Sequence, residues 1–165
     1  MLSFVLGVIC IIINFLIYQQ KSGKRLLVLK LVSDIFWCAH YFSLYAYTGA
    51  FVALLGAVRE VVFIKVDRKS KISKFFLAFF CVLSLAIAVF TWKNIFSAFP
   101  AIASILSVIS FYIANPQISR IMSFPISSCM FTYSLISNSF AGVINEIITV
   151  TSSIIGIIKK EKNNG

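Results

Sequence analysis

Long apolar stretches separated by short polar loops run through the whole chain. Seven such stretches cover residues 2–18, 26–46, 50–66, 75–91, 96–114, 118–137 and 140–158. At roughly 1.5 Å per residue, each is about long enough to cross a hydrocarbon core of roughly 30 Å as an α-helix. The pattern therefore predicts an all-α polytopic membrane protein with seven transmembrane helices.

The Lys and Arg residues are divided unevenly between the loops on the two sides. Of the 15 basic residues, 13 lie in or beside the loops after the first, third, fifth and seventh stretches, whereas the opposite loops hold only Lys93. These 13 are Lys21, Lys24, Arg25, Lys30, Lys65, Arg68, Lys69, Lys71, Lys74, Arg120, Lys159, Lys160 and Lys162. Because short basic loops stay on the cytoplasmic side, we expect the N-terminus outside and the C-terminus inside.

The composition agrees with a membrane protein. Hydrophobic residues make up 60% of the chain and charged residues 12%, and a soluble domain of this composition would aggregate. The 165 residues predict a single transmembrane domain with no separate catalytic domain. The net charge of +10 comes mostly from loops beside the spans, which favours lipid headgroups of the bilayer as partners and argues against nucleic acid.

Motifs of enzymes, metal sites and cofactor sites are absent from the sequence. It has no HExxH, no glycine-rich phosphate loop and no GxSxG. Cys10, Cys38, Cys81 and Cys129 are isolated within apolar stretches, so we expect small buried hydrophobic residues. The sequence therefore predicts no enzymatic activity, no metal and no cofactor.

The two halves of the chain share an order of spans and loops. Aligning residues 38–64 with residues 129–155, an offset of 91, matches six residues, including Cys38 with Cys129. Each half has a span, a basic or polar loop, a span, a tight uncharged turn and a span with a basic exit. Three crossings reverse the side on which the chain emerges, so a linker helix at 75–91 is needed to give both halves the same orientation.

This arrangement predicts two parallel three-helix bundles in a 3+1+3 order, related by a pseudo-two-fold axis along the membrane normal. The predicted parts of the single domain are a first bundle at 1–66, a linker helix with its loops at 67–95 and a second bundle at 96–165. The linker is apolar nearly all round, with Ser84 its clearest polar interior residue, as suits a helix that faces lipid.

Two resemblances point the same way. The segment Tyr112-Ile113-Ala114-Asn115-Pro116-Gln117 resembles the Pro-Gln dipeptide that ends the first helix of a three-helix bundle in SWEET and PQ-loop transporters. The chain is also similar to the YgjV-like family of small bacterial inner-membrane proteins, a relative of that superfamily. The residues that carry this likeness are His40, Leu44, Gly49, Ala50, Arg59, Gly142 and Glu146. It implies a SWEET-like fold in the bacterial cytoplasmic (inner) membrane, without naming a substrate.

Ionisable groups inside the predicted spans are the best indication of function. A charge near the bilayer centre costs about 2.5–3.5 kcal/mol and needs a partner or water. Asp34 and Arg59 fall near mid-depth on neighbouring antiparallel helices, which favours a structural ion pair, with a transport role as the alternative. Lys30, four residues before Asp34, is a competing partner. Glu60 points about 100° away from Arg59, so we expect it to be satisfied by Lys65 or by the inner surface.

A second group of residues predicts a binding site between the bundles. Glu146 has no cation in its helix before Lys159, and His40 lies at a comparable depth, so together they suggest a site for a proton or a cation. The alternatives are a neutral or surface-reaching carboxyl and a packing histidine. Asn145 and Trp37 resemble the positions that contact substrate in SWEET-like proteins. The stripe of Asn145, Thr149, Ser152 and Gly156 suggests helix packing.

These features lead to two hypotheses. The first is a small-solute transporter that alternates access by rocking its bundles about Trp37, His40, Asn145 and Glu146, with Pro100, Pro116 and Pro125 as hinge candidates. The second is a non-transporting scaffold or receptor that binds a partner protein or lipid. An open polar cavity between the bundles favours transport, whereas a dry and fully packed interface favours a scaffold.

Overall fold

Helices make up all the regular structure of the part that the structure describes. The computed structural model describes residues 2–67, 70–92 and 94–164. The elements in these ranges are α1 (Leu2–Gln19), α2 (Gly23–Ser43), α3 (Tyr47–Lys65), α4 (Lys71–Phe90), the short 3₁₀ helix η1 (Ile95–Ser97), α5 (Ala98–Ile113), α6 (Pro116–Ile136) and α7 (Phe140–Asn164). The predicted Arg68, Lys69 and Lys93 of the loops lie outside the described residues.

Five of the helices in these described ranges are long and apolar enough to cross a membrane: α2, α3, α4, α5 together with η1, and α7. α1 is apolar but shorter over Val5–Gln19. α6 is a continuous helix, but several serines along its length lower its apolar character. The predicted all-helical fold is confirmed, and five of its seven predicted spans meet the length and apolarity of a membrane-crossing helix.

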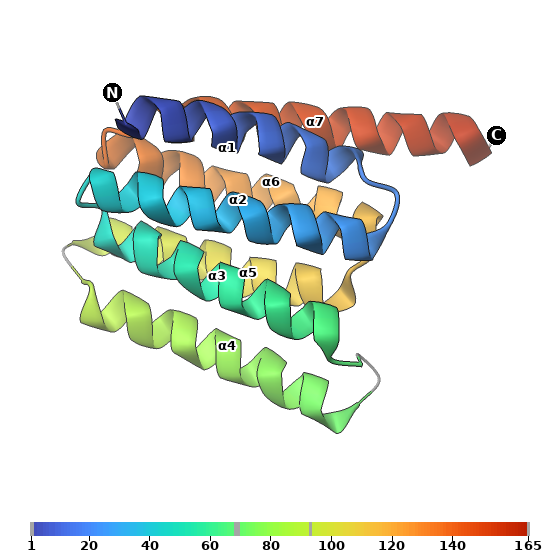
Figure 1. The fold of residues 1–165 in the computed structure, drawn as a ribbon, viewed down its shortest axis with the longest axis horizontal. Coiled ribbons are helices and arrows are strands. Elements are labelled where there is room, and N and C mark those ends of the chain that lie inside the picture. Colours follow the sequence, from blue (N-terminus) through green and yellow to red (C-terminus); the bar gives the residue numbers. More distant parts are fainter. Residues whose placement is uncertain (1, 68–69, 93, 165) are drawn as a thin grey trace.

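The helices form two layers with one helix at the edge (Figure 1). In the first layer α2 lies between α1 and α3, and in the second α6 lies between α5 and α7. α1 packs against α7, and α3 packs against α5, so the six helices close a ring. α4 packs on the outside of this ring, against α3 and α5. The space enclosed by the two layers is where a site can form.

Helix ends define the two ends of the bundle. We call the end at which α1, α3 and α5 finish the basic end, because Lys21, Lys24 and Arg25 lie there. The opposite end, with the α2–α3 and α6–α7 turns, is the turn end. Each turn contains one left-handed residue, Tyr45 with φ 55° and Asn138 with φ 52°. The left-handed residue reverses the chain within a few positions, so the helices that follow pack directly beside those that precede.

The core divides into two clusters along the bundle. Phe63, Phe80 and Phe111 fill the cluster nearer the basic end, together with Ile17 of α1. The cluster nearer the turn end is built on Cys10, Trp37, Tyr41, Ala50 and Tyr133, among other residues. Large apolar side chains also cover the outer surface of the helices, for example Ile12 and Val82. A protein in water would bury such residues, whereas lipid solvates them.

The linker helix α4 is the least buried of the five membrane-crossing helices, as expected for a helix that faces lipid. Its Ser84 nevertheless points inward, with a hydroxyl that donates to the Phe80 carbonyl and lies 2.8 Å from the Ser104 hydroxyl of α5. The predicted polar interior residue of the linker therefore forms its contact with the second layer.

Two of the three proline hinge candidates lie in first turns, where a helix needs no backbone donor. Pro116 is the first residue of α6, and the Asn115 side chain before it accepts a hydrogen bond from the Gln117 N–H at 2.9 Å. Pro100 is the third residue of α5. Pro125 lies in the interior of α6, so it is the proline among the three candidates that removes an interior helix hydrogen bond.

Candidate functional site

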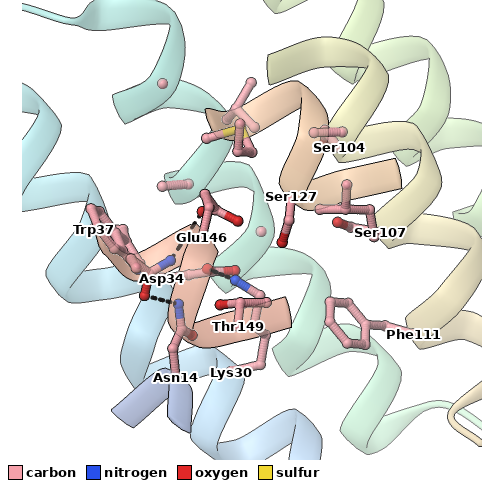
Figure 2. Close-up of a pocket in the computed structure, with 18 of the residues that line it drawn as sticks. Asn14, Lys30, Asp34, Trp37, Ser104, Ser107, Phe111, Ser127, Glu146 and Thr149 are labelled. Atoms are coloured by element: carbon pink, nitrogen blue, oxygen red, sulfur yellow. Dashed lines mark hydrogen bonds and ion pairs between the residues drawn. The ribbon is translucent and has the colours of Figure 1, made fainter. Parts of the chain in front are cut away.

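A polar cavity of about 100 Å³ lies between the two layers. All six helices of the ring contribute to its wall, and Figure 2 shows their side chains converging on one space. The residues with polar groups in the wall are Asn14, Tyr18, Lys30, Asp34, Trp37, Tyr41, Arg59, Ser104, Ser107, Ser127, Asn145, Glu146 and Thr149. Charged side chains are concentrated here, although the surrounding helices are mostly apolar.

Lys30 and Asp34, one turn apart on α2, form the first ion pair in the wall (Figure 2). Arg59, also in the wall, forms a second ion pair with Glu60, which does not itself line the cavity, with 2.7 Å between the guanidinium and a carboxylate oxygen. The predicted Asp34–Arg59 contact is also present but longer, at 4.0 Å. Asp34, Arg59 and Glu60 are all buried. Lys30 thus competes successfully for Asp34, and the four groups form one network of balanced charge.

The expectation for Glu60 needs a correction. We expected its side chain to diverge from Arg59 and to find Lys65 or the inner surface. Instead the Arg59 side chain folds back along α3, so that both Nε and Nη2 donate to the same Glu60 oxygen. The Cβ atoms of the two neighbouring residues do point in different directions, as expected. The Arg59 side chain is long enough to reach the Glu60 carboxylate nevertheless. Glu60 is fully buried and belongs to the network.

Other groups hold Arg59 in place. Its Nη1 donates to the Ser104 carbonyl at 3.4 Å, and its guanidinium carbon lies 5.3 Å from the centre of the Phe111 ring. Both partners belong to α5, in the second layer. A cation over an aromatic face is stabilised electrostatically, more so when water is excluded. Arg59 therefore connects the two layers on the side where α3 meets α5.

A chain of hydrogen bonds orients Glu146. The Ser33 hydroxyl donates to Asn14 Oδ1 at 3.0 Å, and Asn14 Nδ2 donates to Asn145 Oδ1 at 2.7 Å. Asn145 Nδ2 then donates to Glu146 Oε1 at 3.0 Å. Every amide group of the chain is placed by its neighbour, so the direction of the donors is set along its length. The chain ends with a carboxylate oxygen as acceptor, at the cavity.

Two buried hydroxyls in the wall have no hydrogen-bond partner among the described residues. They are those of Ser127 on α6 and Thr149 on α7, one turn beyond Glu146. The Ser127 hydroxyl is directed towards the Glu146 carboxyl, but the geometry falls short of a hydrogen bond. Buried polar groups are nearly always satisfied. These two hydroxyls are therefore available to something within the cavity.

The structure brings together three of the four predicted substrate-binding residues. Trp37, Asn145 and Glu146 line the cavity, whereas His40 does not. The His40 ring packs edge-on against Trp37, with a centroid distance of 5.1 Å, and its Nε2 lies 2.9 Å from the Ser139 hydroxyl in the α6–α7 turn. His40 thus packs against Trp37 outside the cavity and connects the α6–α7 turn to α2.

The polar stripe on α7 has two uses. Ser152 donates to the Phe15 carbonyl at 2.9 Å and accepts from the Gln19 side chain at 3.0 Å, so that part packs α7 against α1, as the small-residue spacing predicts. Asn145 and Thr149, closer to the turn end, line the cavity instead. Sequence reasoning missed Asn14 altogether. Its signal was present, because an amide in the middle of an apolar span needs a partner there.

The layers are also joined beyond the cavity at both ends. At the basic end, Arg120 of α6 donates to the carbonyls of Tyr18 and Gln20, at 3.0 and 3.1 Å. At the turn end, the Tyr133 hydroxyl accepts from the Gly49 N–H at 3.1 Å. Tyr133 also lines a surface depression of about 240 Å³ between the loops of that end. Gly49 lines the central cavity, so this hydrogen bond lies between the depression and the cavity.

Comparison with known proteins adds a family. The Imp-YgjV family model, described as a bacterial inner membrane protein, matches residues 1–164. No curated protein matches the chain, and no solved structure does.

Proposed function

Because the chain belongs to the Imp-YgjV family of bacterial inner membrane proteins, we propose that it moves a small polar solute across that membrane by alternating access and has no enzymatic role. The polar cavity between the two layers carries this proposal. A scaffold needs only a packed interface, whereas this interface contains charged and hydroxyl side chains around an internal space. Intramembrane ionisable groups typically mark solute and ion pathways.

The helix bounds support two structural repeats. α2 and α6 begin at residues 23 and 116 and end at 43 and 136, and α3 and α7 begin at 47 and 140, so each pair differs by 93 residues. The left-handed residues of the two turns, Tyr45 and Asn138, differ by the same 93. The repeat that these bounds support has an offset of 93, two residues more than the offset of 91 that the residue identities suggest. We propose the offset of 93, because identities among apolar residues are frequent by chance.

The contacts between the layers support a two-fold relationship. Applying the same shift to α1 and α3 gives α5 and α7, so the α1–α7 contact corresponds to the α5–α3 contact. α4 lies outside this symmetry, as a linker does. Parallel repeats around a central site are an architecture that secondary transporters use for rocking. In this proposal α1–α3 and α5–α7 are the SWEET-like rocking units.

The two ends of the cavity would then be its gates. With the basic end on the cytoplasmic side, as the distribution of Lys and Arg favours, the Arg120 contacts close the inner gate. The Tyr133–Gly49 hydrogen bond closes the outer one, below the depression at the turn end. Each gate consists of a few hydrogen bonds, which is a barrier that binding energy can overcome.

The cavity volume limits the solute that fits this conformation. About 100 Å³ is room for only a few water molecules. Pockets for drug-sized ligands are typically about 300 Å³ or more. The closed conformation thus suits an ion or a very small solute, and a larger solute requires the layers to separate.

Thiol accessibility tests the proposal. The four native cysteines are replaced, Ser107→Cys is introduced in the cavity wall, and a membrane-impermeant thiol reagent is applied to right-side-out and to inverted membrane vesicles. Alternating access predicts labelling from both sides, each side at its own rate. Ser84→Cys, buried between α4 and α5 away from the cavity, is the matched control and should stay unlabelled. Labelling from neither side, or from one side under all conditions, contradicts transport and favours a scaffold.

A further inference from the structure

We infer that the central cavity binds one monovalent inorganic cation of the size of Na⁺, held by the oxygen atoms of Glu146, Ser127 and Thr149. The inference rests on the proposed function, in which this ion is the solute or the coupling ion. It deepens that function by naming the charge and the chemical class of what the site takes.

The charges around the cavity leave one negative group unmatched. Lys30 is paired with Asp34, and Arg59 with Glu60. Glu146, also buried, forms no ion pair with any residue that the structure describes, and the groups that donate towards its carboxyl are neutral, namely the Asn145 amide and the nearby Ser127 hydroxyl. A lone carboxylate inside a membrane is costly unless a positive charge joins it. The site is thus one positive charge short of neutrality.

The orienting hydrogen bonds show how the carboxyl is prepared. The Ser33–Asn14–Asn145 chain runs its donors towards Glu146 and ends on Oε1. This arrangement fixes the rotamer of Glu146 and occupies one oxygen as an acceptor. A carboxyl that only filled space would not need support from three helices. The other oxygen remains free to face the cavity (Figure 2).

The two hydroxyls supply further oxygen ligands. Elsewhere in these helices Ser and Thr hydroxyls donate to the carbonyl one turn earlier, as Ser128, Thr132 and Thr151 do. Ser127 and Thr149 do not, although their exposed fractions are only 2% and 4%. Thr149 lies on the same face of α7 as Glu146, and Ser127 lines the same cavity from α6. Oxygen lone pairs directed at one small space are what a hard cation requires.

The composition of the site selects among cations. It contains no group of three or more His, Cys, Asp or Glu residues in the described part of the chain, which argues against a transition metal. With two of the three carboxylates already paired, a divalent ion would leave an excess positive charge in the membrane, whereas a monovalent ion gives neutrality. The volume of about 100 Å³ accommodates such an ion with a few waters.

Thermal unfolding of the purified full-length protein in detergent tests the inference. Na⁺, Li⁺, K⁺ and choline chlorides are compared at equal ionic strength and fixed pH. We expect a saturable rise in Tm with Na⁺ above that with choline, because a ligand of the folded state stabilises it by mass action. The rise should disappear in Glu146→Gln and weaken in Ser127→Ala and in Thr149→Val. Ser128→Ala, which loses a hydroxyl on the outer side of the same helix, should keep it.

Direct binding of radioactive ²²Na⁺ to the same variants keeps the test decisive if Glu146→Gln unfolds. Equal effects of all four salts, or Na⁺ binding unchanged in Ser127→Ala and Thr149→Val, would overturn the inference. So would stabilisation that follows pH alone, which would make the positive charge a proton. The proposed function fails separately: if Na⁺ binds but Ser107→Cys, which leaves the three ligand residues intact, is labelled from one side only, the cation site is supported and transport is not. Labelling from both sides without any effect of the cation would support transport and overturn the cation site.

Discussion

The side-chain amide of Asn14 donates a 2.7 Å hydrogen bond to the side-chain oxygen of Asn145, joining residues 131 positions apart in the chain. One lies on α1 and the other on α7, so the bond crosses between the two layers. Both side chains are buried. In a membrane interior, where helices gain little by burying apolar surface against each other, such polar contacts contribute to specific helix association.

Breaking this bond from one side should destabilise the protein by about 1–3 kcal/mol, because the remaining buried amide is left without its partner. We expect Asn14→Leu and Asn145→Leu each to show this loss, and the double variant to lose less than their sum. The measurement is unfolding in mixed micelles of increasing SDS content. Thr151→Leu, at an exposed position on α7, is the control. Strict additivity of the two single changes would show that the bond contributes no coupling.

The helices could be predicted from the sequence more completely than the site. Apolar length alone placed the helices, because a span is specified by residues that are adjacent in the chain. The rotation of each helix about its axis is set by packing between distant segments. That is why His40 and Glu146, at comparable depth, did not turn out to share one cavity, and why Asn14 was not paired with Asn145 in advance. The prediction of the partner of Glu60 was wrong for another reason. The angle between neighbouring Cβ directions does not limit where a long guanidinium side chain can reach.

Removing the cation of the buried Arg59–Glu60 pair should be far more costly than removing the whole pair. Arg59→Met leaves Glu60 buried without its partner and removes a positive charge near Asp34. We expect the free energy of unfolding to fall by about 3–5 kcal/mol. Arg59→Met with Glu60→Met should recover a substantial part of that stability. SDS unfolding measures both.

Lys65→Met, an exposed basic residue at the end of the same helix, controls for the loss of positive charge and should be nearly neutral. If the double variant is as unstable as Arg59→Met alone, the buried carboxylate is not the source of the loss. The packing of Arg59 on Phe111 would then explain it.

Because Gly56 has no side chain, the Asp34 carboxylate can occupy the space beside it. A Cβ at this position of α3 would overlap the Asp34 carboxyl group, which Lys30 holds in place. Helix propensity favours alanine over glycine by about 1 kcal/mol, whereas overpacking costs about 1–3 kcal/mol. We therefore expect Gly56→Ala to be net destabilising in SDS unfolding, with Val58→Ala on the exposed face of α3 as the control. A stabilised Gly56→Ala would mean that Asp34 moves aside freely.

Arg120 offers the sharpest test of the gate at the basic end. Its guanidinium, buried on α6, donates to the carbonyl of Tyr18 near the end of α1 and to that of Gln20 just after the helix. Two hydrogen bonds at about 1 kcal/mol each amount to roughly 2 kcal/mol, or a shift of roughly 30-fold in the open population. Arg120→Ala should therefore raise the labelling rate of Ser107→Cys from the basic side by that order.

The same variant should lower labelling from the turn end, because a population shifted towards one open state is withdrawn from the other. Arg120→Lys should fall between the wild-type protein and Arg120→Ala, since a single ammonium cannot reproduce the planar fork that reaches both carbonyls. Arg25→Ala removes an exposed charge at the same end and should change neither rate. An equal rise in labelling from both sides would indicate general loosening of the bundle, and Arg120 would then be a structural clamp with no part in gating.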